Sequence, residues 1–225
     1  SADDFAGSAH VLDIASKGPA IEGEGLDRIV QQLPTTAQTN LGTGRNKIFL
    51  RGIADSSLVG TAQSTIGMYL DEMRLAYNGA NPDLRLYDIR RIEVVEGPQG
   101  TLYGAGSIGG IIRTQSHKPD LSEASASVWG DLAMTQGGAA SFDMATMIHL
   151  PVSDNLGLRV VGYAQEDGGF IDDIGRGLKN INRTRIAGGR AIFRVELDQD
   201  WIADIAGIYQ QTKARDGQYV DANLD

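Results

Sequence analysis

The sequence predicts two kinds of β structure in succession: a small α+β domain, followed by a series of antiparallel strands. Three observations support this prediction. Residues 90–114 form a pattern of β-branched segment, glycine-rich loop and β-branched segment. After Leu121, apolar and polar residues alternate with a period of two. Only one stretch, near residues 26–33, carries a clear helical pattern.

The central glycine-rich loop is the most distinctive part of the sequence. Gly97-Pro98 and Gly109-Gly110 mark sharp turns at its two ends, and six glycines occur between residues 97 and 110. Glycine adopts positive φ and tolerates close backbone approach at little cost. We therefore expect structural roles for Gly97, Gly104 and Gly109, and positive φ at Gly104 and Gly109.

The other elements of the first domain are short. Residues 10–14, 47–53 and 66–71 are predicted to be strands. Residues 26–33 are predicted to be a helix that Pro34 ends, since Leu26, Ile29, Val30 and Leu33 form one apolar face. A short helical turn is expected near residues 84–89. Strands mixed with short helices predict an α+β domain.

The second half predicts about five strands, near residues 124–134, 142–150, 156–164, 191–197 and 201–209. The turns at residues 151–155 and 198–200 are short, whereas the loops at residues 136–140 and 166–182 lie at the other end, and the latter is long. Short turns at one end and long loops at the other are typical of an outer-membrane β-barrel. The alternation predicts a lipid-facing set of Val128, Leu132, Val160, Phe193 and Ile205.

Composition excludes several classes of protein. The formal charge of −9 argues against a nucleic-acid binder, and the absence of cysteine excludes disulfide and thiolate chemistry. His10, His117 and His149 are too scattered to predict a metal site. No apolar run approaches the ~20 residues of a transmembrane helix, although barrel strands need only about ten alternating residues. We expect no cofactor and no enzymatic activity. The N-terminus lacks a secretion signal, so export of this protein would imply that the sequence is a mature or trimmed form.

The central motif also resembles a known family. Residues 95–112, VEGPQGTLYGAGSIGGII, are similar to the plug-domain signature of TonB-dependent outer-membrane receptors. Residues 48–52 resemble the family's "IRG" strand, and residues 68–72 resemble its "YLDGV" strand, with Glu72 where glycine is common. The resemblance covers residues 9–119. The helix ending Pro34-Thr35-Thr36 departs from the family's pattern.

The resemblance implies a plug domain at residues 1–119 and the first five or so strands of a 22-stranded barrel at residues 120–225. Five strands cannot close around such a plug, so the remaining strands belong either to the rest of this chain or to another chain. The implied function is energised uptake of a ferric siderophore or a similar scarce nutrient across the outer membrane of a Gram-negative bacterium. The implied partners are TonB with its inner-membrane energising complex, outer-membrane lipid and the remaining barrel strands. No clear TonB box precedes Ala9; either the chain has lost it or the sequence is trimmed.

The resemblance also implies site residues. Plug charges of the family meet charges on the barrel wall, which assigns this role to Arg51, Arg91, Glu93 and Glu96. Plug loops touch the ligand, and Arg45, Gln63 and Tyr77 offer a cation, an amide and an aromatic ring for an anionic chelate. These three loops are expected to converge at the end of the domain opposite Ala9.

Two rival hypotheses follow from the same residues. Gly104-x-Gly106-x-x-Gly109 matches the dinucleotide-binding fingerprint, but that motif needs a helix after it, and Ile111-Ile112 predicts a strand. A soluble nucleotide-binding enzyme is therefore disfavoured. The other rival is a non-transporting plug and barrel module within a larger outer-membrane assembly. The adjacent acids Asp71-Glu72 and Asp172-Asp173 are predicted to be turn or solvent-facing residues rather than catalytic pairs.

Overall fold

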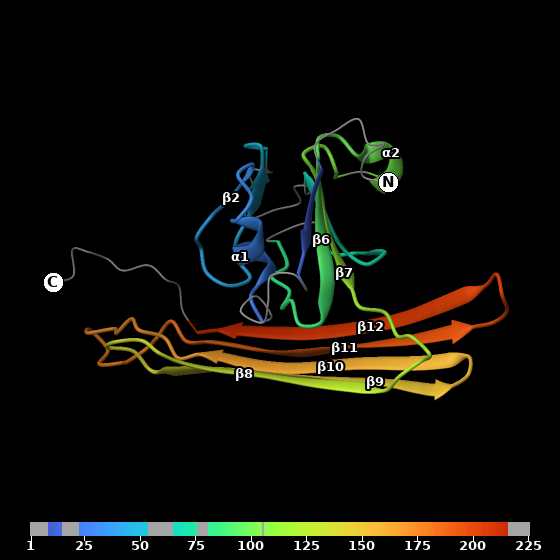
Figure 1. The fold of residues 1–225 in the computed structure, drawn as a ribbon. Coiled ribbons are helices and arrows are strands. Elements are labelled where there is room, and N and C mark those ends of the chain that lie inside the picture. Colours follow the sequence, from blue (N-terminus) through green and yellow to red (C-terminus); the bar gives the residue numbers. More distant parts are fainter. Residues whose placement is uncertain (1–8, 15–22, 54–64, 76–80, 105, 216–225) are drawn as a thin grey trace. The chain divides into compact units, whose positions relative to one another are not determined.

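The computed structural model describes residues 9–14, 23–53, 65–75, 81–104 and 106–215. The chain divides into two compact units, Ser1–His117 and Lys118–Asp225. Figure 1 shows a mixed sheet with short helices in the first unit and long antiparallel strands in the second. Among the described residues, no helix is long and apolar enough to cross a membrane.

The first unit is built on a mixed sheet with strand order β1-β6-β7-β4-β5. Its strands are β1 (Ala9–Asp13), β4 (Ile66–Leu70), β5 (Met73–Arg74), β6 (Ile89–Glu96) and β7 (Gly110–Ser116). β6 and β7, the two β-branched segments of the central motif, pair antiparallel, whereas β7 and β4 pair parallel. The prediction of a mixed α+β fold is therefore confirmed.

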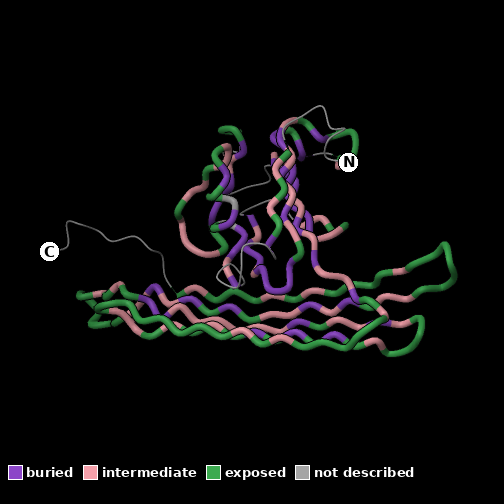
Figure 2. The backbone as a smooth tube through the Cα atoms, in the orientation of Figure 1, coloured by how far each residue is buried: buried purple, intermediate pink, exposed green. Residues whose placement is uncertain are grey.

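One face of this sheet carries the core. Ile92 and Val94 on β6 and Ile112 on β7 are fully buried, and so is Met68 on β4. The register aligns Met68, Ile112 and Val94 across the three strands. Figure 2 shows the concentration of buried residues along this sheet. The opposite face carries the charged side chains described below, together with the buried side chains of Ile111 and Tyr69.

The helices differ from the prediction in extent and in place. Helix α1 spans Leu26–Val30 and buries Leu26 and Ile29, but it ends before Leu33, which is buried in the turn that follows. The helical turn predicted near residues 84–89 is wrong, because this backbone pairs with another segment instead: Leu26 N–H donates to Leu84 O at 3.1 Å, and Leu86 N–H donates to Glu24 O at 3.2 Å. A four-residue helix, α2 (Gly100–Tyr103), lies within the glycine-rich loop and was not predicted.

A second, two-stranded sheet joins β2 (Thr36–Gln38) and β3 (Ile48–Leu50). The predicted strand at residues 47–53 is therefore shorter, because Arg51 and Gly52 turn back on it with φ values of 52° and 77°. Ile53 N–H donates to Leu50 O at 2.8 Å across this turn. β2 was not predicted.

Different structural constraints favour glycine at different positions of the central loop. Gly97 and Gly104 adopt φ of 87° and 73°, as expected for positions that side chains resist. The expectation of positive φ at Gly109 is wrong: this residue is instead constrained by a close neighbour, since a Cβ there would lie 3.3 Å from Ile53 Cγ2. The most constrained position is Gly110, with φ of 138° and no room for a Cβ beside the carbonyl oxygen of Val95.

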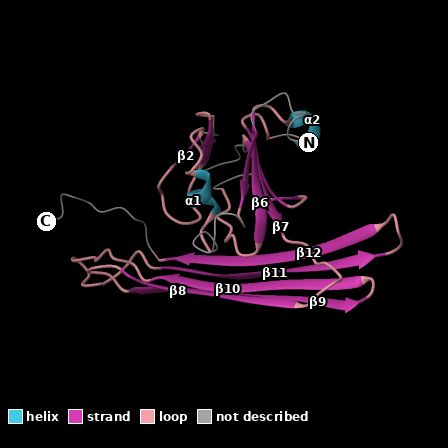
Figure 3. Ribbon diagram, viewed as in Figure 1, coloured by secondary structure: helices cyan, strands magenta, loops and turns pink. Residues whose placement is uncertain are grey.

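The second unit is one sheet of five antiparallel strands in the order β12-β11-β10-β9-β8. Figure 3 shows these long strands side by side as one sheet. Their bounds are β8 (Ser125–Met134), β9 (Ala140–Ser153), β10 (Leu156–Asp167), β11 (Thr184–Glu196) and β12 (Ile202–Ala214). β9–β10 and β11–β12 are joined by short turns, and β10–β11 by a long loop, so the predicted antiparallel strands are confirmed.

The pairing register decides which side chains share a face of this sheet. Val160 on β10 lies opposite Ile148 on β9 and Ala191 on β11. By the same register, one face carries the whole predicted apolar set, Val128, Leu132, Val160, Phe193 and Ile205, and all five are exposed. We call this the apolar face.

A short segment before β8 is held against the strands of the second unit. His149 Nε2 lies 3.2 Å from the N and 3.0 Å from the O of Asp120, and a Cβ on Gly157 would lie 2.9 Å from Asp120 O. The Asp120 carboxylate accepts hydrogen bonds from the N–H and the hydroxyl of Ser122. These hydrogen bonds hold the pKa of Asp120 below its ordinary value.

Candidate functional site

The polar face of the first unit's sheet carries a linked set of charges. Arg91 and Glu93 on β6 lie opposite Gln115 and Arg113 on β7. Glu93 Oε1 lies 2.9 Å from Arg91 Nη2, and Glu93 Oε2 lies 3.7 Å from Arg113 Nη1. The Gln115 amide connects them, accepting from Arg91 Nε at 2.8 Å and donating to Glu93 at 3.1 Å. The predicted plug charges Arg91 and Glu93 therefore pair with each other.

Arg113 extends this network to the turn between β4 and β5. Its Nε donates to the carbonyl oxygen of Asp71 at 3.2 Å, and its Nη2 contacts the Glu72 carboxylate. Glu72 is a solvent-facing turn residue, as predicted, with 87% of its side chain exposed. Asp71, in contrast, accepts hydrogen bonds from the N–H and the hydroxyl of Ser116 at the end of β7.

A second charged group lies at the end of β6. The Glu96 side chain is 2% exposed, and its Oε1 lies 3.4 Å from Nε2 of His10 on β1. Its Oε2 lies 3.9 Å from Nε of Arg51, whose side chain is 62% exposed. Neither Glu96 Oε1 nor His10 Nε2 has a hydrogen-bond partner among the residues that the structure describes. Among the described residues, this buried carboxylate thus has a histidine ring nitrogen beside one oxygen and a long ion pair with an exposed arginine at the other.

The proposed ligand-contacting residue Arg45 lies elsewhere in the domain. It is exposed in a turn, where its N–H donates to Gly42 O at 3.0 Å. The neighbouring Asn46 closes the loop by accepting from Leu41 N–H at 2.8 Å. The carbonyl oxygen of Asn46 accepts from Asn81 N–H at 3.0 Å.

Gln63 and Tyr77 lie outside the described residues, but the residues flanking their segments are described. Asn81, which follows the segment containing Tyr77, is bonded to Asn46 beside Arg45. Thr65, which follows the segment containing Gln63, accepts from Gly109 N–H at 2.9 Å, and Gly109 borders the end of the sheet where Ala9 pairs with Val95. Because Gln63 and Tyr77 themselves lie outside the described residues, the convergence of the three loops opposite Ala9 stays a prediction.

Sequence reasoning missed three members of these charged groups: His10, Arg113 and Gln115. Arg113 and Gln115 are two residues apart on β7, as Arg91 and Glu93 are on β6, so each pair lies on one face of its strand. This shared period of two was the available signal. Nothing local pairs His10 with Glu96, because their contact depends on the register of two strands far apart in sequence. Among the described residues, no group of three or more histidine, aspartate or glutamate side chains could hold a metal ion.

Comparisons with known proteins identify the first unit. Residues 21–111 match the family model described as the TonB-dependent receptor plug domain. These residues are a TonB-dependent receptor plug domain. The matched residues include Arg91, Glu93, Glu96 and the glycine-rich loop, whereas their partners His10, Arg113 and Gln115 lie just outside the match. The dinucleotide-binding alternative is not supported, since the strand β7 follows the loop where a helix would be required.

Whole-chain comparisons extend the likeness beyond the plug domain. The pesticin receptors of Yersinia enterocolitica and Yersinia pestis are 28% identical over 200 residues, covering 88% of this chain. The ferric yersiniabactin uptake receptor FyuA from Yersinia pestis matches 96% of this chain with a TM-score of 0.77 and 23% identity. The ferripyoverdine receptor of the outer membrane of Pseudomonas aeruginosa matches 93% with a TM-score of 0.72 and 19% identity.

The likeness to these solved structures shows a common fold across both units. The chain spans 28% of the length of the pesticin receptors and 35% and 26% of the two solved chains. Its plug domain and antiparallel strands therefore correspond to part of each relative.

Proposed function

We propose that this chain supplies the plug domain and the first barrel strands of a TonB-dependent receptor in the outer membrane of a Gram-negative bacterium. The observation that carries the proposal is the succession of a plug domain and five antiparallel strands with one exposed apolar face. The strands are 10 to 14 residues long, which is sufficient to cross a bilayer when tilted.

The proposed activity is energised uptake of a ferric siderophore or a similar scarce nutrient. Support comes from relatives whose names include ferric yersiniabactin and ferripyoverdine. In this proposal TonB engages the receptor from the periplasm, and the remaining strands close the barrel around the plug. The plug–barrel boundary is proposed near Pro119.

Residues of the plug have two proposed roles. Arg45 and Tyr77 are proposed to contact an anionic chelate, because the described flank of the Tyr77 segment lies beside the Arg45 loop. Gln63 is a third candidate contact, and the position of Thr65 makes it the least supported of the three. Arg51, Arg91, Glu93 and Glu96 are proposed to meet charges of the barrel lumen in addition to their partners within the plug.

Uptake of iron chelates by the complete receptor tests this proposal. The full reading frame is expressed in a Gram-negative strain without its own siderophore receptors, and cells are supplied with ⁵⁵Fe complexes of yersiniabactin, pyoverdine and enterobactin. Accumulation of one complex that stops when TonB is deleted supports the proposal. Binding of a complex without accumulation, in cells where a control receptor transports, would instead support a non-transporting module.

A further inference from the structure

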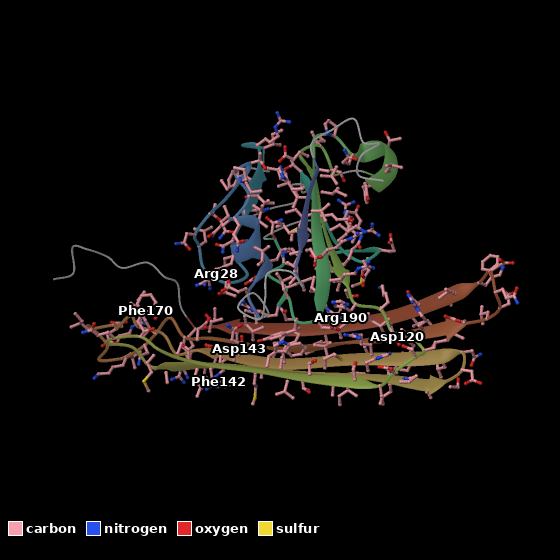
Figure 4. All side chains as sticks on the ribbon, in the orientation of Figure 1. Arg28, Asp120, Phe142, Asp143, Phe170 and Arg190 are labelled. Carbon is pink, nitrogen blue, oxygen red and sulfur yellow. The ribbon has the colours of Figure 1, made fainter. Side chains whose placement is uncertain are left out.

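The apolar face of the second unit has one charged row. Between Ala126 on β8 and Lys213 on β12, the only charged residues that the register places on the apolar face of these described strands are Glu166, Arg185 and Lys213. All three lie in a single row, in which Phe142 pairs with Glu166, Glu166 with Arg185, and Arg185 with Lys213. In Figure 4 the labelled neighbours Phe142 and Asp143 project from opposite faces of β9, which matches this alternation.

Two more cations lie in the next row of the same face, at the ends of the strands. Arg215 N–H donates to Arg183 O at 3.0 Å, so the ladder between β11 and β12 extends one step beyond the pair Thr184 and Ala214. Arg183 and Arg215 are each two residues from a member of the charged row, and the alternation places them on the same face. We call Arg183, Arg185, Lys213 and Arg215 the cation array.

Within the part of the chain that the structure describes, the cation array has more positive charge than its ion-pair partners neutralise. Glu166 binds two of the four cations: Arg185 Nε donates to it at 2.7 Å, and Arg183 Nη1 lies 3.3 Å from it. The Nε of Arg183 is buried and has no hydrogen-bond partner among the described residues. Arg185 lies directly opposite Lys213, an arrangement of like charges that destabilises a strand pair. This surplus occurs in a chain whose formal net charge is −9.

The position of the array on the strands identifies the kind of anion. From Arg185 to Val195, β11 runs ten residues, about 33 Å along the strand. At the usual barrel tilt this corresponds to about 25 Å, the height of the apolar band of an outer-membrane barrel. The array therefore lies at the edge of that band, beside the long loop, at the depth of lipid headgroups. Phosphate oxygens suit the planar donors of arginine and would separate the opposed cations.

We propose that the cation array binds the phosphate groups of a lipid headgroup in the outer leaflet of the outer membrane. This inference rests on the proposed function, because it requires the strands to span that membrane. It adds a lipid site on the outside of the barrel, distinct from any ligand site of the plug. Charge attraction brings the headgroup to the array, and the apolar face below it packs against the acyl chains.

The test measures lipid binding to the complete receptor purified in detergent. Diphosphoryl lipid A is titrated and bound lipid is counted by native mass spectrometry, with the same lipid lacking both phosphates as the reference. The double variant Arg185→Gln/Lys213→Gln should bind diphosphoryl lipid A roughly thirtyfold more weakly, since each cation near an anionic surface contributes about fivefold. The charge-preserving variant Arg185→Lys/Lys213→Arg should retain most of the binding.

A matched control removes two other cations from the same end of the strands. Arg176 and Lys179 are exposed in the loop between β10 and β11, outside the row on the apolar face. Arg176→Gln/Lys179→Gln should bind lipid A as the wild type does. Equal weakening by this control, equal binding of the dephosphorylated lipid, or unchanged binding by the Arg185/Lys213 double variant would each overturn the inference. Displacement of the lipid by millimolar inorganic phosphate would also overturn it, since a free anion would then suffice.

Two further measurements separate this inference from the proposed function. Heat-modifiable migration in gels reports whether each variant forms a barrel. Absence of such migration in the complete receptor would contradict both the proposed function and the lipid site. Uptake of ⁵⁵Fe chelate reports transport. A receptor that transports but binds lipid independently of the array contradicts only the lipid site. A barrel that binds lipid through the array but transports nothing contradicts only the transport function.

Discussion

Both carboxylate oxygens of Asp71 accept hydrogen bonds from Ser116, one from its N–H at 2.9 Å and one from its hydroxyl at 2.7 Å. This contact joins the turn after β4 to the end of β7. Asp71 has φ of 52°, so the turn is held in a backbone conformation that residues other than glycine seldom adopt. Ser116 is buried, which makes the loss of its partner costly.

Asp71→Ala should destabilise the end of β7, whereas Glu72→Ala should have little effect. Loss of hydrogen bonds to the buried Ser116 costs about 1–3 kcal/mol, while an exposed ion pair such as that of Glu72 contributes about 0–1 kcal/mol. Hydrogen exchange of the β7 amides in the complete receptor measures both. We expect exchange about 5- to 150-fold faster in Asp71→Ala. Equal exchange in the two variants would contradict the structural role of Asp71.

His10→Ala should loosen β1 from β6. The substitution removes one of the two described side chains that face the buried Glu96 carboxylate and should cost about 1–3 kcal/mol. Val11→Ala is the matched control on the same strand, because Val11 is 48% exposed and its truncation should cost no more than about 0.5 kcal/mol. Amide exchange in β1 should increase in His10→Ala and stay near the wild-type rate in the control.

Alanine substitutions at the loop glycines should destabilise the plug to different extents, depending on the space around each new Cβ and not only on φ. Gly110→Ala should be the most destabilising, since its Cβ would overlap the Val95 carbonyl oxygen at φ of 138°. Gly104→Ala meets no atom of the described residues within 4 Å, but its φ of 73° and ψ of −163° lie in a region that essentially only glycine adopts, so the strain should cost about 1–3 kcal/mol. Limited proteolysis of the plug in the complete receptor provides the ranking. Greater sensitivity of Gly104→Ala than of Gly110→Ala would contradict it.

Arginine substitutions should distinguish the two faces of the five-stranded sheet. Val160→Arg places a charge in the middle of the apolar face and should destabilise a membrane-inserted barrel by about 2–4 kcal/mol. Ser127→Arg lies at a similar depth on the other face, where Ser127 pairs with Met147 and Met147 with Val161, and should be tolerated. Equilibrium folding of the complete receptor into bilayers is the measurement. Equal tolerance of the two substitutions would contradict the assignment of these strands to a barrel.

Arg45→Ala should weaken chelate binding by the complete receptor roughly ten- to hundredfold, if Arg45 donates a charge-assisted hydrogen bond worth about 1.5–3 kcal/mol. Arg51→Ala is the informative comparison, because Arg51 is also exposed but lies at the other end of β3, paired with Glu96. Equilibrium binding of the transported ⁵⁵Fe chelate checks both. Weaker binding in Arg51→Ala alone would move the ligand site to the Glu96 end of the plug.

The sequence by itself determined the order of elements and the faces of the long strands. Alternation fixes which side chains share a face, so Val160 and Phe193 could be grouped before any pairing was known. β-branched residues on both sides of the glycine-rich loop were enough to predict β6 and β7. These inferences succeed because they depend on side-chain direction and local backbone preference, both of which act within a few residues.

The tertiary structure decided what depends on partners distant in sequence. Residues 84–86 are extended rather than helical because their backbone pairs with residues 24–26. Gly109 is constrained by Ile53 rather than by its own φ, and Glu96 is paired with His10 only through the register of β1 and β6. The cation array likewise exists only because the β11–β12 ladder brings Arg183 beside Arg215. Hydrogen-bond partners, steric neighbours and ion pairs of this kind are set by register, which no local pattern encodes.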